Sequence, residues 1–295
     1  MRVDPNPMPD VLAALNSSRQ NQQDALLQIS SGRRVNLPSD DPAAAAVLVT
    51  NHDQTTATSR YLQNLNSIEG QFQTADATLN SVVTALQRAL TLGVQGANSP
   101  LSDADRQAIA GELQGIQDQL LSLANTSFEG RFLFGGTVTS TPPYAADDTQ
   151  PSGVRYDGNA AINTVQIGDG YRMAVNQPGS QIFSAAGHDV FQSMTGLIQA
   201  MQTNSNFDSA IAAVRDSFDY ISGQRVFYGN ATNQAQSQTT YLNSAKLQLA
   251  QQDNTLAGVD MATAASQLVN SNNAVEATLA AMSRLSQMNL FDFLK

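Results

Sequence analysis

The chain has 295 residues, of which 41% are hydrophobic but only 6% aromatic, with no tryptophan and no cysteine. Its net charge is −10, and adjacent Arg33 and Arg34 are its nearest approach to the clustered positive charge that nucleic-acid binding requires. Disulfides and thiolate metal sites are excluded by the missing cysteines. A compact enzyme of this length normally carries more large apolar side chains, whereas long helices that meet along narrow seams need fewer.

Segments for membrane insertion or signal cleavage are not expected. The longest apolar run, 43–49, is far shorter than the roughly 20 residues that span a bilayer. The first ten residues are polar and proline-rich, without the basic start and apolar core of a secretory signal. If the protein leaves the cell, we expect a route without signal cleavage.

A short helix is expected before Gly32. Its candidate face steps by three and four residues and has apolar ends with a polar middle: Leu12, Leu15, Arg19, Gln22, Leu26 and Ile29. Residues 33–39 read as an extended joint. Asp41 then offers an N-cap, with Pro42 at the favoured first helical position.

A long helix is predicted from Pro42 to about Gly93, because 43–99 holds no proline. Two seams of spacing seven indicate coiled-coil packing. They comprise Leu65, Phe72, Leu79 and Leu86, and Tyr61, Ile68, Ala75, Val82 and Ala89. Ser102 and Asp105 form a capping-box signature for the next helix. Its apolar face comprises Ile109, Leu113, Ile116, Leu120 and Leu123.

The middle of the chain predicts a small β-rich insertion. Between 137 and about 183, glycine, proline, threonine and tyrosine increase and the pattern alternates with period two. We expect a strand at 154–157 and a hairpin of 165–167 and 171–175 around an intervening Gly-Asp-Gly. Phe134-Gly135-Gly136 reads as a helix exit rather than a phosphate-binding loop.

The C-terminal part mirrors the N-terminal part, with a helix over 207–256 and a joint at Gly258 and Asp260. The last helix carries Met261, Leu268, Val275 and Met282 at spacing seven, joined by Leu279 and Leu285. The expected fold is mainly α: an elongated antiparallel helical rod or coiled coil built from both chain ends, with a small β-rich insertion domain. The expected domains, from assembly helix through rod, insertion and rod to assembly helix, are 1–35, 36–136, 137–190, 191–257 and 258–295.

No residue pattern indicates catalysis, a cofactor or a metal site. His52 and His188 are far apart in sequence, and His52 reads as a surface or seam residue. Serine-hydrolase, zinc-protease and phosphate-loop motifs do not occur. Adjacent Asp40 and Asp41 resemble paired carboxylates, but capping the following helix is the stronger interpretation. We therefore predict a protein that is not an enzyme.

Several stretches resemble the flagellin superfamily: residues 28–36 (Gln-Ile-Ser-Ser-Gly-Arg-Arg-Val-Asn), 38–43 (Pro-Ser-Asp-Asp-Pro-Ala), 131–137 and 289–294. The Ser-Asp-Asp-Pro sequence, 131–137 and the apolar C-terminal stretch are more similar to the hook–filament junction branch than to flagellins. The proline-rich leader 1–9 and the polar Lys295 depart from the family pattern.

The resemblance implies a structural protein of the bacterial flagellum, exported by the type III apparatus with a chaperone bound at its C-terminal region. It would form a homo-oligomeric ring between hook-associated protein 1 and flagellin. Phe291, Phe293 and Leu294 form an apolar end that favours a partner surface. The remaining expected assembly residues, which pack within or between subunits, are Leu12, Leu15, Leu26, Ile29, Leu268, Val275, Met282 and Leu285.

Three alternatives remain at this point. The chain could be a flagellin that forms the filament body. It could be another coiled-coil protein, such as a secreted translocator, although the lack of a membrane segment removes most of these. It could carry a hydrolase in the central insertion, which would need an acid–base pair in a cleft.

Overall fold

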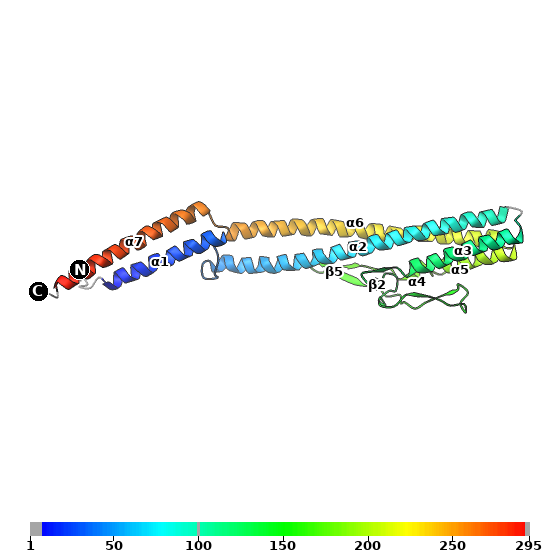
Figure 1. The fold of residues 1–295 in the computed structure, drawn as a ribbon, viewed down its shortest axis with the longest axis horizontal. Helices are drawn as coiled ribbons and strands as arrows, with labels where there is room; N and C mark the ends of the chain where they lie inside the picture. The colour runs from blue at the N-terminus through cyan, green and yellow to red at the C-terminus, as the bar shows by residue number, and fades with distance from the viewer. Residues whose placement is uncertain (1–7, 99–100, 293–295) are drawn as a thin grey trace. The chain divides into compact units, whose positions relative to one another are not determined.

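The computed structural model describes residues 8–98 and 101–292, with side chains as far as residue 284. It confirms a mainly helical chain with long helices towards both ends and a strand-containing middle (Figure 1). Its described parts divide into two compact units, one within 1–57 and 244–295 and the other within 58–243. The helices are α1 (Met8–Ser31), α2 (Pro42–Asn98), α3 (Asp103–Ala124), α4 (Gly179–Ile182), α5 (Val190–Thr203), α6 (Phe207–Ala257) and α7 (Met261–Asp292).

The predicted helix starts are confirmed. The backbone N–H of Ala44 donates to Asp41 Oδ1 at 3.0 Å, and α2 begins at Pro42. At α3 the Ser102 hydroxyl accepts from the Asp105 N–H at 3.2 Å, and the Asp105 carboxylate accepts from the Ser102 N–H at 3.3 Å. Each contact satisfies a donor that helical hydrogen bonding leaves free.

In the unit within 58–243, α2 and α6 run antiparallel. Arg225 donates to the two carboxylate oxygens of Asp76 at 2.9 and 3.0 Å, and Gln236 donates to Glu69 at 3.0 Å. Glu69 precedes Asp76 on α2, whereas its partner Gln236 follows Arg225 on α6, so the two helices run in opposite directions. The predicted α2 seams form the core. Their fully buried members are Leu65, Ile68, Phe72, Ala75, Leu79, Val82, Leu86 and Ala89.

Helices α3 and α5 complete this core. The predicted apolar face of α3 is buried at Ile109, Leu113, Ile116 and Leu120. Helix α5 was not predicted as a separate element. It packs closely on α3, and its N-cap is Asp189, whose carboxylate accepts from the Gln192 N–H at 2.8 Å. A proline-free segment with continuous apolar content gave no sign of where one helix ends and the next begins.

The strands form three antiparallel pairs: β1 (Ser127–Phe128) with β2 (Arg131–Phe132), β3 (Tyr144–Ala146) with β4 (Val154–Tyr156), and β5 (Thr164–Gly168) with β6 (Tyr171–Ala174). The predicted strand at 154–157 and the predicted hairpin are confirmed. The β1–β2 pair and β3 were missed because two or three residues are too short for an alternating pattern.

The interpretation of Phe134-Gly135-Gly136 as a helix exit is wrong, because α3 ends at Ala124, before the β1–β2 pair. The two glycines are needed for close packing of loops. A Cβ on Gly135 would lie 2.1 Å from the carbonyl oxygen of Val138. Gly136 has φ of 71°, and a Cβ there would lie 2.2 Å from the carbonyl oxygen of Asn159. Only glycine fits both requirements at Gly136.

An aromatic cluster joins the strand-containing segment to α5. The Tyr144 ring lies 4.9 Å from that of Tyr156 and 5.2 Å from that of Phe191, between ring centroids. Phe134 and Phe183 extend the cluster at 5.1 Å in an edge-to-face arrangement. Burial raises the pKa of the Tyr144 hydroxyl, which stays protonated and contacts Ser184. Aromatic packing thus holds the strand-containing segment, where helical seams are absent.

Candidate assembly surface

Within the unit that contains both chain ends, α1 and α7 lie side by side along their length (Figure 1). Gln22 Nε2 donates to Asn272 Oδ1 at 2.7 Å. Arg33 and Gly258 form an isolated antiparallel bridge beyond the other end of the helices. The residue number on α7 rises as that on α1 falls, so the two helices are antiparallel.

Most of the fully covered positions in the seam between α1 and α7 carry small side chains. The four described buried residues are Leu15, Ala25, Ala264 and Ser271. Half-buried side chains continue the same three–four spacing and comprise Val11, Ser18, Gln22, Ile29, Leu268, Val275 and Met282. Small residues let the backbones approach closely, but they remove little apolar area from water. A helix pair held by such a seam is marginally stable by itself.

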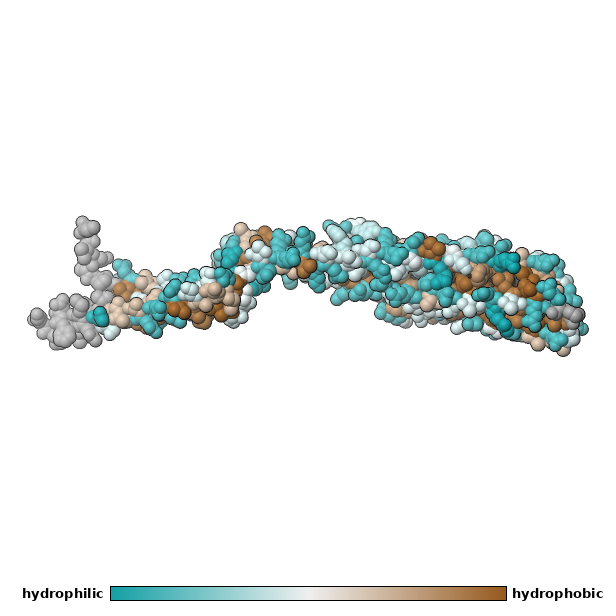
Figure 2. All heavy atoms as spheres, turned by 90° about the horizontal axis from the view of Figure 1, so that it is seen from above, coloured by the Kyte–Doolittle hydropathy of each residue, from teal (hydrophilic) through white to brown (hydrophobic). Residues whose placement is uncertain are grey.

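Among the described side chains of this pair, six large apolar ones remain in water. On α1 they are Leu12, Leu26 and Leu27, with exposed fractions of 44%, 48% and 52%. On α7 they are Met261, Val269 and Leu279, at 51%, 56% and 44%. Figure 2 shows apolar atoms reaching the surface along the terminal helices. We call these six residues the exposed apolar set.

The structure places the predicted assembly residues in three groups. Leu12 and Leu26 lie outside the α1–α7 seam and are exposed, whereas Leu15 is buried in it. Ile29, Leu268, Val275 and Met282 are half-buried along its edges. Leu285 and Phe291 lie in α7 but beyond the described side chains, and Phe293 and Leu294 lie outside the described residues.

Sequence reasoning did not select Leu27 and Val269. Each directly follows another apolar residue, Leu26 or Leu268. Successive residues on a helix point about 100° apart, so two adjacent apolar residues cannot share one seam. Such adjacent pairs in the sequence therefore indicate that these helices carry apolar side chains on more than one face.

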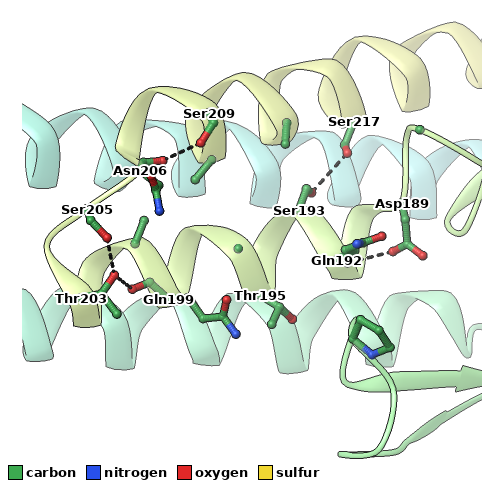
Figure 3. Close-up of a pocket in the computed structure, with 16 residues that line it drawn as sticks. Asp189, Gln192, Ser193, Thr195, Gln199, Thr203, Ser205, Asn206, Ser209 and Ser217 are labelled. Carbon is green, nitrogen blue, oxygen red and sulfur yellow. Dashed lines mark hydrogen bonds between the residues drawn. The ribbon is translucent and has the colours of Figure 1, made fainter.

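A groove in the unit within 58–243 is a different kind of site. It lies between α5 and the start of α6, has a volume of about 950 Å³ and is lined mainly by small and hydroxyl side chains (Figure 3). Ser217 donates to Ser193 at 3.2 Å, and Ser193 donates to the carbonyl oxygen of Val190 at 2.9 Å. Asp189, whose pKa is raised by burial, caps α5.

This groove does not have the arrangement that the hydrolase alternative needs. Its serines bond to one another, to the Thr203 hydroxyl or to backbone oxygens, and none of the residues that line it is a histidine. His188 follows the groove residue Gly187, but its ring stacks on Tyr220 with centroids 4.6 Å apart. A nucleophile activated by a neighbouring base is thus not assembled among the lining residues.

In the part of the chain that the structure describes, no cluster of three or more histidine, cysteine or acidic side chains could hold a metal ion. Within the same residues, every helix is too short or too polar to cross a bilayer.

Comparison with known proteins relates both helical ends to one family. A model of the bacterial flagellin N-terminal helical region matches residues 9–139, and one of the bacterial flagellin C-terminal helical region matches 211–294. Together these matches cover more than two thirds of the chain.

Individual relatives agree. The chain is 28% identical over 294 residues to flagellar hook-associated protein 3 of Escherichia coli, covering 91% of each chain. It is 33% identical over 189 residues to hook-associated protein 3 of Salmonella typhimurium, covering 64% of this chain and 58% of that protein. Flagellins of Vibrio anguillarum and Bacillus subtilis match as well.

A solved flagellar hook-associated protein from Vibrio parahaemolyticus has the same fold, with a TM-score of 0.68 and 24% identity, covering 74% of this chain and all of that one. The relatives are flagellar structural proteins, which is consistent with a chain that is not an enzyme. The chain therefore has a structural role in the bacterial flagellum, an extracellular appendage, and it belongs to the flagellin family.

Proposed function

We propose that the chain is the subunit that joins the hook to the filament. In this proposal it forms a homo-oligomeric ring between hook-associated protein 1 and the first layer of flagellin. Two hook-associated protein 3 sequences are among its relatives, and the motifs at 38–43, 131–137 and 289–294 resemble that branch. Export without signal cleavage, with a chaperone at the C-terminal region, belongs to the same proposal.

The exposed apolar set is the observation that carries the proposal. Burying a large aliphatic side chain fully contributes about 1.5–3 kcal/mol, and these six side chains keep roughly half of their surface in water. Contacts with neighbouring subunits would cover that surface. The small α1–α7 seam contributes too little to make this pair rigid alone, so assembly would also stabilise its helices.

This proposal gives each segment of the chain a role in the ring. Residues 1–35 and 258–295 would supply the assembly helices, and residues 36–136 and 191–257 would supply the two halves of the helical rod. Residues 137–190 would form an insertion outside the ring contacts. Leu15, Ile29, Leu268, Val275 and Met282 would then pack within the subunit.

The side chains proposed to meet a partner differ from those of the seam. They are the exposed apolar set, which includes Leu12 and Leu26, together with Leu285, Phe291, Phe293 and Leu294, which follow or end the apolar pattern of the last helix. A hook-associated surface is expected to recognise them by apolar contact, because charge is sparse on both terminal helices.

Ordered addition tests the proposal. Hook fragments ending in hook-associated protein 1 are incubated with the chain, washed and supplied with flagellin, and filaments are scored by electron microscopy. We expect a single added layer of the chain and filament growth only after its addition. If the chain alone extends into long filaments, it is a flagellin. If it fails to bind the hook end, the junction assignment is wrong.

A further inference from the structure

The segment that connects α1 to α2 and the segment that connects α6 to α7 are hydrogen-bonded to each other. Both belong to the unit that contains the chain ends. The Arg34 N–H donates to the carbonyl oxygen of Ala257 at 2.7 Å, and the Val259 N–H donates to that of Gly32 at 3.2 Å. The connection from α1 to α2 therefore runs beside the connection from α6 to α7. Nearby Val35 and Ala257 are buried, so this is a packed joint.

The Arg34 side chain adds contacts that no other residue of the joint makes. Its Nη2 donates to the carbonyl oxygen of Leu256 at 2.9 Å and to Asp41 Oδ2 at 3.1 Å. Leu256 lies in the last turn of α6, and Asp41 caps the start of α2. One guanidinium thus lies at the negative end of one helix and pairs with the carboxylate at the positive end of another.

We propose that Arg34 is a positioning residue for assembly. Its contacts to Leu256 and Asp41, which we call the Arg34 bridge, hold the α1–α7 pair in one orientation on the adjoining ends of α2 and α6. Both chain ends would then present the exposed apolar set as a single body. This consequence for assembly rests on the proposed function, whereas the bridge itself is a property of the single chain.

The bridge acts through geometry more than through charge. The side chains of Arg34 and Asp41 are 49% and 31% exposed, and an ion pair this open to water contributes little by itself. A planar guanidinium can reach two acceptors at fixed angles, which a lysine ammonium on a flexible stem does less well. The backbone turn at 36–40 is held independently of the Arg34 bridge, because Asp40 accepts from the N–H groups of Asn36 and Leu37 at 2.9 and 2.8 Å.

Arg33 provides a matched control in the neighbouring position. Its backbone takes part in the joint, since its carbonyl oxygen accepts from Asn36 Nδ2 at 2.9 Å and it bridges Gly258. Its guanidinium, however, bonds to none of the residues that the structure describes. Arg33→Ala removes the same charge from the same joint without removing the bridge.

Because the chain has no cysteine, spin labels can be attached at Gln20→Cys on α1 and Gln54→Cys on α2, both exposed and both in this unit. Electron–electron distance measurements on the full-length monomer then report the joint directly. We expect one narrow distance distribution in the parent and in Arg33→Ala, loss of that single distance in Arg34→Ala, and partial loss in Arg34→Lys. Equal distributions in Arg34→Ala and Arg33→Ala would overturn the proposal.

A second comparison covers the case in which Arg34→Ala loses helix content. Arg34→Lys and Arg33→Lys keep the charge, and hydrogen exchange at the Val259 amide is compared between them. We expect roughly tenfold faster exchange in Arg34→Lys only; equal rates contradict the bridge. Neither readout needs a flagellar partner. A normal joint in a chain that fails to bind the hook end would contradict the proposed function and leave the bridge intact.

Discussion

At the scale of single residues, glycine positions differ in whether the backbone conformation and the surrounding atoms exclude every other residue. Gly136 combines φ of 71° with a carbonyl oxygen 2.2 Å from where a Cβ would lie. We expect Gly136→Ala to lower the free energy of unfolding by at least about 2 kcal/mol, because it adds both backbone strain and a clash with rigid atoms. Urea unfolding followed by circular dichroism measures the change.

Gly111→Ala is the matched control. Gly111 is exposed in the middle of α3, and a Cβ there would meet nothing within 4 Å. Alanine should raise the unfolding free energy by about 0.5–1 kcal/mol, through better helix propensity and a less flexible unfolded chain. A similar loss in both variants would show that Gly136 is not specially constrained.

Local residue roles were the easiest to predict from the sequence. The Asp41–Pro42 start and the Ser102–Asp105 capping box depend on neighbours three positions away at most, and the structure shows both. The glycine pair at 135 and 136 could not be interpreted in this way. Gly135 is constrained by the carbonyl oxygen of Val138, and Gly136 by Asn159, which is brought there only by the folded strand-containing segment.

At the scale of elements, the starts of α2, α3 and α7 have aspartate carboxylates whose pKa is lowered by the hydrogen bonds that they accept. Helix capping lowers the pKa of Asp41 through the Ala44 N–H and Arg34, that of Asp105 through Ser102, and that of Asp260 through Thr263. A pKa lowered by folding gives stability that is present above the unfolded value of about 3.9. This stability is lost as the pH falls through the lower folded value.

Asp105→Asn tests this sign at α3. We expect the variant to be less stable than the parent at pH 7, and the difference to shrink as the pH is lowered from about 4 towards 2, where Asp105 becomes protonated in the folded parent. Urea midpoints across that range provide the measurement. A difference that stays constant down to pH 2 would show that the Asp105 charge does not contribute.

The α1–α7 pair depends on small residues at its seam. Ala264 is buried against α1, whereas its neighbour Ala265 is exposed. Ala264→Leu should push the helices apart at a cost of about 1–3 kcal/mol, because the seam has no space for added methylenes. Hydrogen exchange should then quicken in α1 and α7 while the core of the unit within 58–243 is unchanged.

Ala265→Leu adds the same atoms on the outer face and serves as the control. It should leave the exchange rates of α1 and α7 close to those of the parent. If both variants behave alike, the seam assigned to Ala25, Ala264 and Ser271 does not hold the pair together. Faster exchange throughout the chain in Ala264→Leu would mean that the two units unfold together.

The long helices were predictable because proline-free length and sustained heptad spacing act over many residues. The seams at Leu65 to Leu86 and Ile68 to Ala89 are the core that this spacing indicated. Helix α5, the β1–β2 pair and β3 could not be predicted, because each is defined by tertiary contacts rather than by periodicity. The Tyr144 cluster, which fixes α5 against the strands, joins residues far apart in the sequence.

At the scale of the whole molecule, the low aromatic content and the net charge of −10 excluded function classes without naming a function. Family motifs at both ends then indicated the flagellum, and the family models agree. The sequence could not show which terminal leucines face inward. That choice depends on the packing of α1 against α7, which buries Ala25 and Ala264 and leaves Leu26 and Leu27 in water.

The central claim is that the exposed apolar set carries assembly. Binding of the full-length chain to hook ends tests it most directly, measured by co-sedimentation for Leu12→Glu/Leu26→Glu and for a control, Val226→Glu/Tyr241→Glu. The control pair is more exposed, at 61% and 65%, but lies on α6 in the other unit. We expect the first variant to keep its helix content and lose binding, while the control binds as the parent does. Undiminished binding by the Leu12→Glu/Leu26→Glu variant would contradict the claim.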